Sequence, residues 1–338
     1  MTPTQAQHRI SGSARYTGIR RLAHHFSVCT LLALTASPLH AQWTPSRDVE
    51  MVVPFGAGGG ADLTARIVTK IIADEKLTPV HLTVVNRPGG GTSVGIANVV
   101  NNKRGDGHTL VLINPQSVIT PLQFKDAKGW RQLTPVANLM LDDYLMLTYK
   151  ESPFQDPGAI VGYARSKPPR TISIASSGPA DDMAIAVFEA ATGVRFKIVR
   201  FNGGGQIQTM LLGKHVDLGV GNPLEYLAQI NAGLLRPLGV YRSARFDLMS
   251  TVPTMKEQGV DVVPFQMWRG IALPPDAPAG AVQYWQDVMQ KVMASKPYKD
   301  YLRSNMATEH PLYAREFSSF LEQQEALYRD MLARLETK

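Results

Sequence analysis

Residues 51–66 read Met51-Val-Val-Pro-Phe-Gly-Ala-Gly-Gly-Gly-Ala-Asp-Leu-Thr-Ala-Arg66, and this stretch predicts a strand that runs through a glycine loop into a helix. The apolar run Met51–Val53 is typical of a buried strand. After the loop, apolar residues recur at Leu63, Ile67 and Ile71, the spacing of one helix face. Asp62 precedes them, and we expect its carboxylate to accept N–H groups of the first helical turn.

A glycine loop at the start of a helix can be interpreted in two ways, as an anion-binding site or as a tight turn. Unpaired N–H groups and the helix dipole favour a bound anion, and glycine lets a ligand approach the backbone. Alternatively, the glycines only provide the backbone angles of a tight turn. The stretch alone leaves both open.

Residues 1–41 have the layout of an export signal. They contain four arginines and no acidic residue, then the apolar run Phe26–Leu34, and they end in a small residue, Ala41. This run is much shorter than the roughly 20 residues of a membrane span. Because Cys29 lacks a small residue before it, we expect no lipid anchor and a soluble periplasmic protein, cleaved near Ala41. Arg20 and Arg21 do not decide between general secretion and twin-arginine export.

Charge and cysteine content argue against a nucleic-acid-binding protein and against a disulfide-stabilised protein. Removing the four leader arginines lowers the net charge from +7 to about +3, and no dense basic run remains to bind nucleic acid. The single cysteine also leaves with the leader, so the mature chain has no disulfide bonds and depends on its core.

After residue 41, predicted strands alternate with predicted helices, which indicates an α/β fold with mostly parallel sheets flanked by helices in two lobes. We expect a first lobe at 42–145, a second at 146–264, and a return to the first at 265–338, helical from Pro278 on. The expected strands are Met51–Val53, Val80–Val85, Thr109–Ile113, Thr171–Ala175, Lys197–Phe201, Val216–Val220, Arg236–Tyr241 and Phe265–Leu273. The expected helices include Ser93–Val100, Pro157–Ser166, Asp181–Thr192, Gln206–Leu212 and Pro223–Ala232.

Two motifs suggest enzymes. Gly56–Ala61 fits the dinucleotide fingerprint, but Asn86 stands where that fingerprint needs an acid. Gly91–Gly95 fits the G-x-S-x-G elbow around Ser93, but residues 86–91 separate it from its strand. We expect Ser93 to be a helix cap, and an exported serine hydrolase using Ser93 stays the alternative function.

The remaining polar residues do not form an obvious catalytic or metal set. The four histidines after the leader, His81, His108, His215 and His310, are not at ligand spacing, so we expect surface or strand-edge positions. We interpret Asp142-Asp143 as a solvated turn and Asp181-Asp182 as acids at a helix N-terminus. The chemistry this favours is reversible capture of a small anion between two lobes, without a cofactor.

The chain resembles the periplasmic solute receptors of tripartite tricarboxylate transporters, the Bug family. The markers are Val52–Phe55 with Gly58, Gly59, Asp62 and Ala65-Arg66; Val85–Gly91; Asp106–Leu110; Phe201–Gly204; Gly213–Asp217; and Pro274-Pro275 with Ala277-Pro278. The resemblance covers essentially the whole chain after the leader.

The resemblance implies a type II periplasmic-binding fold, the two-lobed Venus flytrap, whose cleft binds a carboxylate. Ligands in the family are di- and tricarboxylates, acidic amino acids and aromatic acids. The receptor would be a monomer and no enzyme, and would deliver its ligand to the membrane subunits of a tripartite tricarboxylate transporter or to the periplasmic domain of a sensor kinase.

Carried over residue by residue, the resemblance implies two groups of ligand-binding residues. In the first lobe these are Pro54, Phe55, Gly58, Gly59, Asp62, Gly89 and Gly90, with Asp62 shaping the loop rather than touching the anion. In the second lobe, which usually selects the acid, they are Ser176, Ser177, Gly178, Asn202, Gly203 and Asn222. The chain departs from the family pattern at 179–182 and at Asn202, so no relative's ligand can be transferred. We interpret Lys197, Arg200 and Arg269 as surface or ion-paired residues.

Overall fold

The glycine loop joins strand β1 (Val49–Val53) to helix α2 (Gly60–Asp74) in the computed structural model, which describes residues 43–263 and 265–336. The predicted export signal lies outside the described residues. Side chains of β1 alternate between two cores: Met51 and Val53 pack with α2, whereas Val52 packs with residues of the opposite face. This alternation explains why the strand reads as a continuous apolar run.

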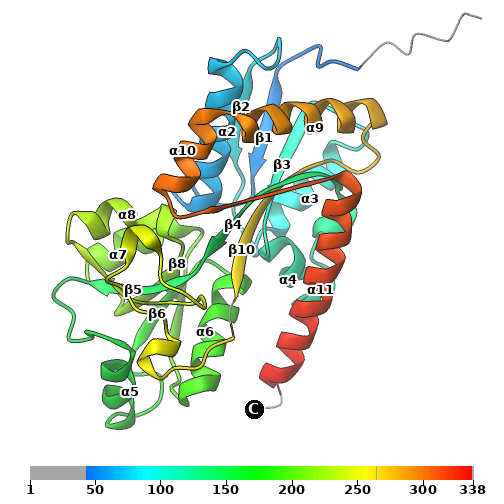
Figure 1. Ribbon diagram of the computed structural model, residues 1–338. Helices are drawn as coiled ribbons and strands as arrows, with labels where there is room; N and C mark the ends of the chain where they lie inside the picture. The colour runs from blue at the N-terminus through cyan, green and yellow to red at the C-terminus, as the bar shows by residue number, and fades with distance from the viewer. Residues whose placement is uncertain (1–42, 264, 337–338) are drawn as a thin grey trace, which may run out of the picture. The chain divides into compact units, whose positions relative to one another are not determined.

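The first sheet has six strands in the order β11-β4-β10-β3-β1-β2. Strands β2 and β3 pair with β1 in parallel, whereas β10, β4 and β11 add antiparallel pairs. The other strands are β2 (Leu82–Asn86), β3 (Thr109–Ile113), β4 (Thr134–Asp143), β10 (Gln266–Leu273) and β11 (Thr308–Tyr313). The sheet's helices are α3 (Ser93–Asn102), α4 (Gln116–Gln123), α9 (Ala279–Ala294), α10 (Lys296–Ser304) and α11 (Ala314–Glu336), with the short η1 (Trp130–Gln132). We call this sheet with its helices the first lobe (Figure 1).

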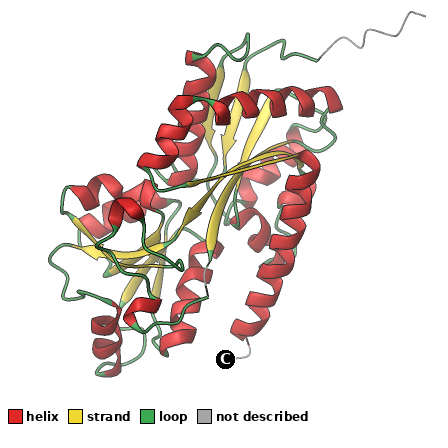
Figure 2. Ribbon diagram, viewed as in Figure 1, coloured by secondary structure: helices red, strands yellow, loops and turns green. Residues whose placement is uncertain are grey.

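The second sheet has five strands in the order β7-β6-β8-β5-β9. Strands β7 and β8 pair with β6 in parallel, and β5 pairs antiparallel with β8 and β9. The strands are β5 (Leu145–Tyr149), β6 (Ser173–Ser176), β7 (Lys197–Arg200), β8 (Leu218–Gly221) and β9 (Leu235–Val240). The helices are α5 (Pro157–Arg165), α6 (Pro179–Thr192), α7 (Gly204–Leu212), α8 (Pro223–Asn231), η2 (Asp247–Met249) and η3 (Lys256–Gln258). This is the second lobe; helices flank both sheets (Figure 2).

Parallel pairing therefore holds within the strand–helix repeats, and the antiparallel pairs involve the strands at the lobe crossings. The chain leaves the first lobe at β4, passes Tyr144 and enters the second at β5. It returns along β10, which pairs antiparallel with β4 over its whole length.

The interpretation of Asp142-Asp143 as a solvated turn is wrong. Both residues belong to β4 and are buried, and the strand ends after them. Arg269 on the neighbouring strand β10 forms an ion pair with Asp142, with 3.0 Å between Nη2 and Oδ2. Because a buried charge needs a partner, this pair allows an acid inside the sheet.

The region after Pro278 is not entirely helical. Strand β11 forms the edge of the first sheet, and its Pro311 is tolerated there because an edge strand leaves some N–H groups without a ladder partner. Helix α11 then packs on β4 and against α4 and α6. Its Tyr328 hydroxyl accepts a hydrogen bond from Trp268 Nε1 at 3.0 Å, which fixes α11 to β10.

Candidate ligand-binding site

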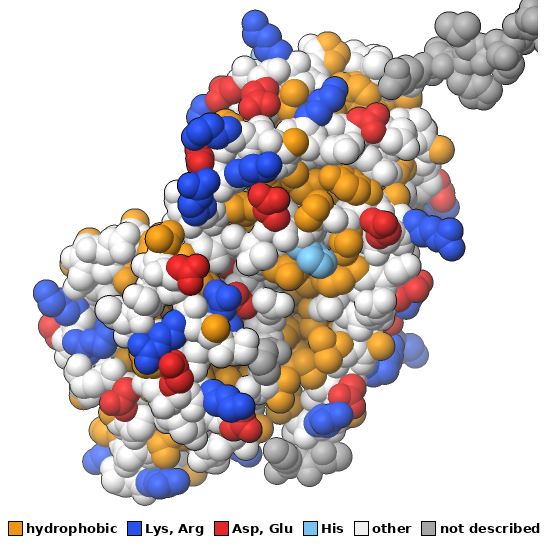
Figure 3. All heavy atoms as spheres, in the orientation of Figure 1, with side chains coloured by type: hydrophobic (Ala, Val, Ile, Leu, Met, Phe, Trp, Pro, Cys, Tyr) orange, Lys and Arg blue, Asp and Glu red, His pale blue; other side chains and the backbone are white. Residues whose placement is uncertain are grey.

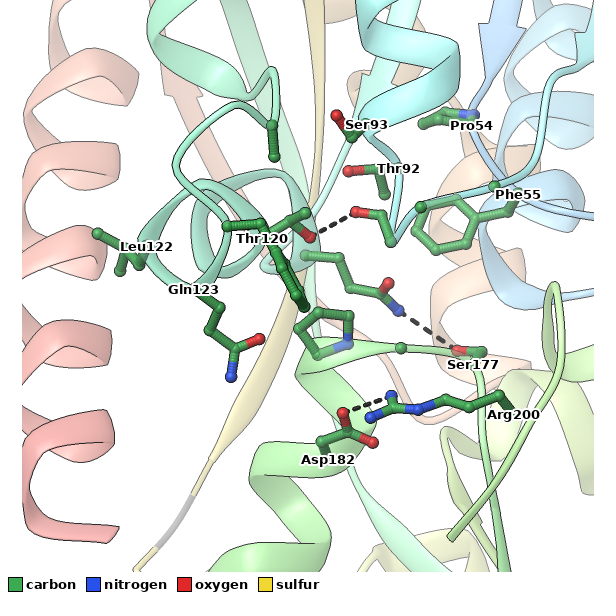
Figure 4. A pocket seen from close by; sticks show the side chains of 18 of the residues that line it. Pro54, Phe55, Thr92, Ser93, Thr120, Leu122, Gln123, Ser177, Asp182 and Arg200 are labelled. Carbon is green, nitrogen blue, oxygen red and sulfur yellow. Dashed lines mark hydrogen bonds and ion pairs between the residues drawn. The ribbon is translucent and has the colours of Figure 1, made fainter. Parts of the chain in front are cut away.

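Turns from both lobes meet around a cavity of about 1100 Å³ (Figure 4). In the first lobe, β1, β2 and β3 lead into α2, α3 and α4; in the second, β6, β7 and β8 lead into α6, α7 and α8. Parallel strands end at one edge of a sheet, so these turns gather there, where α/β proteins bind ligands.

The predicted ligand-binding residues fall into three groups. One group lines this large cavity: Pro54, Phe55, Gly89, Gly90, Ser177, Gly178 and Asn202. A second group lines a cavity of about 20 Å³ together with Phe55 and Ser177: Gly59, Gly203 and Asn222. The third group lines neither: Gly58, Asp62 and Ser176. Their roles in binding stay predictions.

Asp62 shapes the glycine loop instead of capping the helix. Helix α2 begins at Gly60, and the Asp62 carboxylate accepts hydrogen bonds from Gly58 N (3.0 Å), Asn86 Nδ2 (3.0 Å) and Arg66 Nε (2.8 Å). Burial would raise the pKa of Asp62, but these hydrogen bonds hold it below its ordinary value. The expectation that Asp62 caps the first helical turn is wrong, because its donor Gly58 precedes the helix.

The N-terminus of α2 holds a carboxylate of the chain itself. Glu225, in the first turn of α8, accepts a hydrogen bond from Gly60 N at 2.6 Å and one from Asn222 N at 3.3 Å. A Cβ on Gly204 would lie 2.6 Å from Glu225 Oε1, and one on Gly221 would lie 2.7 Å from Oε2. These two glycines of the second lobe thus make room for this carboxylate, and Glu225 fills part of the anion cradle that the sequence predicts.

Asp181 organises the turn after β6. Its Oδ2 accepts hydrogen bonds from the backbone N and the Oγ of Ser177, both at 2.6 Å, and its Oδ1 accepts one from Tyr144 OH at 3.2 Å. Burial raises the pKa of Asp181 to about 7, although the Ser177 hydrogen bonds lower it. Asp181 and Asp182 lie in the first turn of α6, as the sequence predicts.

The basic side chains that line the cavity are already ion-paired. Arg200 pairs with Asp182, and Arg329 pairs with Glu325 at 3.2 Å. Arg269, expected at the surface or in an ion pair, is buried in its pair with Asp142, and it also donates to Asn222 Oδ1 at 3.1 Å. Lys197 is exposed on β7. On the face in Figure 3, basic and acidic side chains of the described residues are interspersed.

Polar residues that the sequence analysis did not select also line the large cavity: Thr92, Gln116, Thr120, Gln123 and Asp126. Gln116 and Thr120 belong to α4, which was not predicted because it is short and contains Pro121. The sequence does contain a pattern that predicts the start of α4, because Asn114-Pro115 follows β3 as Asn222-Pro223 follows β8. In the structure, Asn114 Oδ1 accepts a hydrogen bond from Gln116 N at 3.0 Å. Likewise, Asn222 and Glu225 have the spacing of a capping box.

Ser93 lines the cavity but is not a helix cap. It is the first residue of α3, and its Oγ accepts a hydrogen bond from Lys128 N at 2.9 Å. Among the histidines in the described part of the chain, His108 forms side-chain hydrogen bonds with Ser46 and Asp106, and His310 forms one with Asn138. Ser93 Oγ is thus hydrogen-bonded to a backbone N–H, and within residues 43–263 and 265–336 none of these histidine hydrogen bonds reaches it.

Within residues 43–263 and 265–336, no three His, Cys, Asp or Glu side chains are grouped to hold a metal ion. The helices over the same ranges include none that combines the length and apolar character of a membrane span.

Solved structures, among them that of a periplasmic binding protein, share this fold. The periplasmic binding protein BugD matches with a TM-score of 0.80 and 22% identity over 86% of this chain and 98% of that one. An R. palustris protein with adipate matches with a TM-score of 0.78 and 23% identity, over 86% of this chain and 98% of that one. MatC from Rhodopseudomonas palustris, with bound malate, matches with a TM-score of 0.77 and 22% identity over 85% of this chain and 99% of that one. The predicted two-lobed periplasmic-binding fold is confirmed.

The chain belongs to the tripartite tricarboxylate transporter family receptors, TctC, whose family model matches residues 65–334. Protein BugT of Bordetella pertussis is 26% identical over 244 residues, 71% of this chain and 74% of that protein. A UPF0065 protein of Cupriavidus necator is 26% identical over 298 residues, 86% of this chain and 88% of that protein. The predicted membership of the Bug family is thereby confirmed.

Proposed function

We propose that this protein is a periplasmic receptor that binds one small carboxylate in the large cavity and delivers it to the membrane subunits of a tripartite tricarboxylate transporter. The carrying observation is the cavity itself, lined by Phe55 and Gly89 from the first lobe and by Ser177 and Asn202 from the second. A ligand between them contacts both lobes, so binding favours their approach.

The electrostatics of the cavity fit an anion held by neutral donors. Arg200 is paired with Asp182, whereas Arg329 shares the single carboxylate of Glu325 with Arg131, and Asp126 adds an acidic side chain to the lining. The neutral groups at the cavity wall are the N-terminus of α3, which begins at Ser93, and polar side chains such as Thr92. Helix N-termini attract anions without a basic residue. The adipate and malate named in two structures of similar fold support a carboxylate as the ligand class.

The test is a thermal-shift screen of the purified protein against aliphatic dicarboxylates, tricarboxylates, acidic amino acids and aromatic acids. We expect one chemical group to raise Tm, because a ligand at 100 times its Kd adds about 2.7 kcal/mol to the free energy of unfolding. Neutral sugars of similar size serve as the control panel. If no acid raises the Tm of folded, ligand-free protein, the proposal fails.

The delivery partner and the location rest on the family and on the predicted export signal. Transport would be carried by the membrane subunits; the periplasmic domain of a sensor kinase is the other receiver for such a receptor. Uptake of the identified acid by cells that lack this gene, compared with cells complemented with it, separates the two roles. Loss of uptake supports transport, and unchanged uptake with lost gene induction supports sensing.

A further inference from the structure

Two residues that line the large cavity each have one buried polar atom without a hydrogen-bond partner among the described residues. The atoms are Thr92 Oγ1, in a residue that is 2% exposed, and Gln116 Oε1, in a residue that is 1% exposed. A buried polar atom without a partner costs free energy, so most such atoms in folded proteins are paired. Both atoms are therefore placed to receive their partner from a molecule in the cavity.

Thr92 has a strained backbone as well as an unpaired hydroxyl. Residues 89–92 all have positive φ, and the first three are glycines. Thr92 has φ 82° and ψ −20°, an uncommon conformation for a β-branched residue. It is the N-cap residue of α3, yet its side chain makes no capping hydrogen bond. Strain of this kind gathers at ligand sites, where the residue's chemistry outweighs its cost.

The orientation of the Gln116 amide follows from its neighbour Ser177. The Ser177 hydroxyl has one proton, and it donates this proton to Asp181 Oδ2 at 2.6 Å. Ser177 Oγ must then accept from Gln116, whose Nε2 lies 3.3 Å away. Gln116 Oε1 is thus left as a pure acceptor. A Cβ on Gly178 would lie 2.4 Å from this oxygen, so glycine is needed to leave it room.

The two atoms have different requirements. A threonine hydroxyl donates a hydrogen bond to a carboxylate, whereas an amide oxygen only accepts. In Figure 4, Thr92 and Ser177, the residue that holds the Gln116 amide, lie on opposite sides of the same space next to Phe55. A plain dicarboxylate brings only acceptors at neutral pH and leaves Gln116 Oε1 unpaired.

We propose that Thr92 and Gln116 determine specificity, and that they select a carboxylate that also carries a hydroxyl or ammonium donor. The carboxylate accepts from Thr92, and the donor bonds to Gln116 Oε1. This inference rests on the proposed function, since it names the class of acid that the cavity takes.

Isothermal titration calorimetry with matched acids tests the inference on the purified protein. The probes are succinate, malate and aspartate, and the longer series glutarate, 2-hydroxyglutarate and glutamate. We expect a donor-bearing acid of one series to bind about tenfold or more tightly than its plain dicarboxylate, because a buried acceptor penalises a ligand without a donor. Comparison of malate with aspartate then identifies the donor as hydroxyl or ammonium.

Two sets of variants assign the effect to these side chains. Gln116→Met should reduce the preference to within about twofold, since it keeps the length of the side chain and removes the acceptor. Gln290→Met is the control, because Gln290 is an exposed glutamine of α9 that lines neither cavity; the preference should not change. Thr92→Gly should raise the Tm of the ligand-free protein by relieving the backbone, and weaken all the acids alike, whereas Thr92→Ser should keep their affinity.

The inference is overturned if the plain dicarboxylate binds as tightly as its donor-bearing counterparts in the wild-type protein, a comparison that needs no variant. It is also overturned if none of the six acids binds. In that case a different carboxylate from the screening panel would still support the proposed function, and the absence of any bound acid would remove both.

Discussion

At the residue scale, Asp181 shows how a short turn depends on a buried acid. Its carboxylate holds the backbone and the hydroxyl of Ser177, and through them the Gln116 amide of the other lobe. Its folded-state pKa of about 7 lies above the ordinary 3.8 of an exposed aspartate. Between these values the folded protein binds a proton that the unfolded chain does not bind, so the stability from Asp181 falls as pH rises and is lost above about pH 7.

Asp181→Asn should therefore flatten the decline of unfolding free energy between about pH 4 and pH 7. Each pKa unit corresponds to about 1.4 kcal/mol, and asparagine has no such titration. Denaturant unfolding at several pH values measures the slope. Asp142 titrates in the same direction, because burial raises its pKa to about 7 against the pull of Arg269, so part of the slope should remain. Parallel curves for wild type and variant would contradict this account of Asp181.

Gly60 is a second position where one atom matters. A Cβ there would lie 2.4 Å from Arg269 Nη2, and Arg269 is held by Asp142. Gly60→Ala should lower the free energy of unfolding by about 1–3 kcal/mol through overpacking. Gly162→Ala is the control: nothing lies within 4 Å of its Cβ, so alanine should stabilise exposed α5 by up to about 1 kcal/mol. Equal effects in chemical denaturation would refute the steric argument.

At the element scale, the N-terminus of α2 is stabilised by Glu225 of α8. Glu225→Gln keeps the shape but removes the charge, and should lower the unfolding free energy by about 0.3–2 kcal/mol, the range for a charge at a helix terminus. Glu322 is an exposed residue of α11, and Glu322→Gln should change the unfolding free energy by less than about 0.5 kcal/mol. A variant at Glu225 that melts like wild type would show that this carboxylate contributes nothing.

How far the elements could be predicted depends on where their determinants lie. Strand β3 was predicted at its observed bounds because five consecutive buried residues stand between turn residues. Strand β11 was missed, since its residues alternate weakly and its role depends on β4, far away in sequence. Asp142 was misread because its partner Arg269 is 127 residues away.

The same distinction holds for the candidate site. The glycine loops around Phe55 and Gly89 can be recognised in the sequence, and they line the cavity. Thr92 and Gln116 also line it, but the sequence does not indicate them, because a positive φ at a threonine and an unpaired amide oxygen are seen only in the structure. The sequence predicts the helix start that contains Glu225, but it does not predict the contact of Glu225 with Gly60, because that contact requires the second lobe to approach the first.

At the scale of the whole molecule, the two lobes touch through backbone as well as side chains. Gly56 N donates to Asn202 O at 2.8 Å, and Gly60 N donates to Glu225 at 2.6 Å. A Cβ on Gly205 would lie 2.7 Å from Ala57 O and 3.2 Å from Gly58 C. Such close backbone contact is possible only while glycine occupies these positions, so the contact is sensitive to a single methyl group.

Gly205→Ala should act as a wedge between the lobes. Residue 205 lies in α7, where alanine is favourable, so each lobe should fold normally. The methyl group should hold the loops of the two lobes apart, so that the closed arrangement of the lobes is less populated. Binding of the acid should then weaken by tenfold or more, and the radius of gyration measured by solution scattering should increase. Gly162→Ala should bind and scatter like wild type. Undiminished affinity in Gly205→Ala would mean that binding does not need this contact.

The central claim is that a small carboxylate occupies the cavity where the turns of both lobes meet. The most direct measurement is a crystal structure of the protein with the tightest-binding acid from the screen. The account predicts density for one acid within hydrogen-bond distance of Thr92, Gln116 and residues of the 89–91 loop. Density for the acid elsewhere on the chain, with this cavity holding only water, would contradict it.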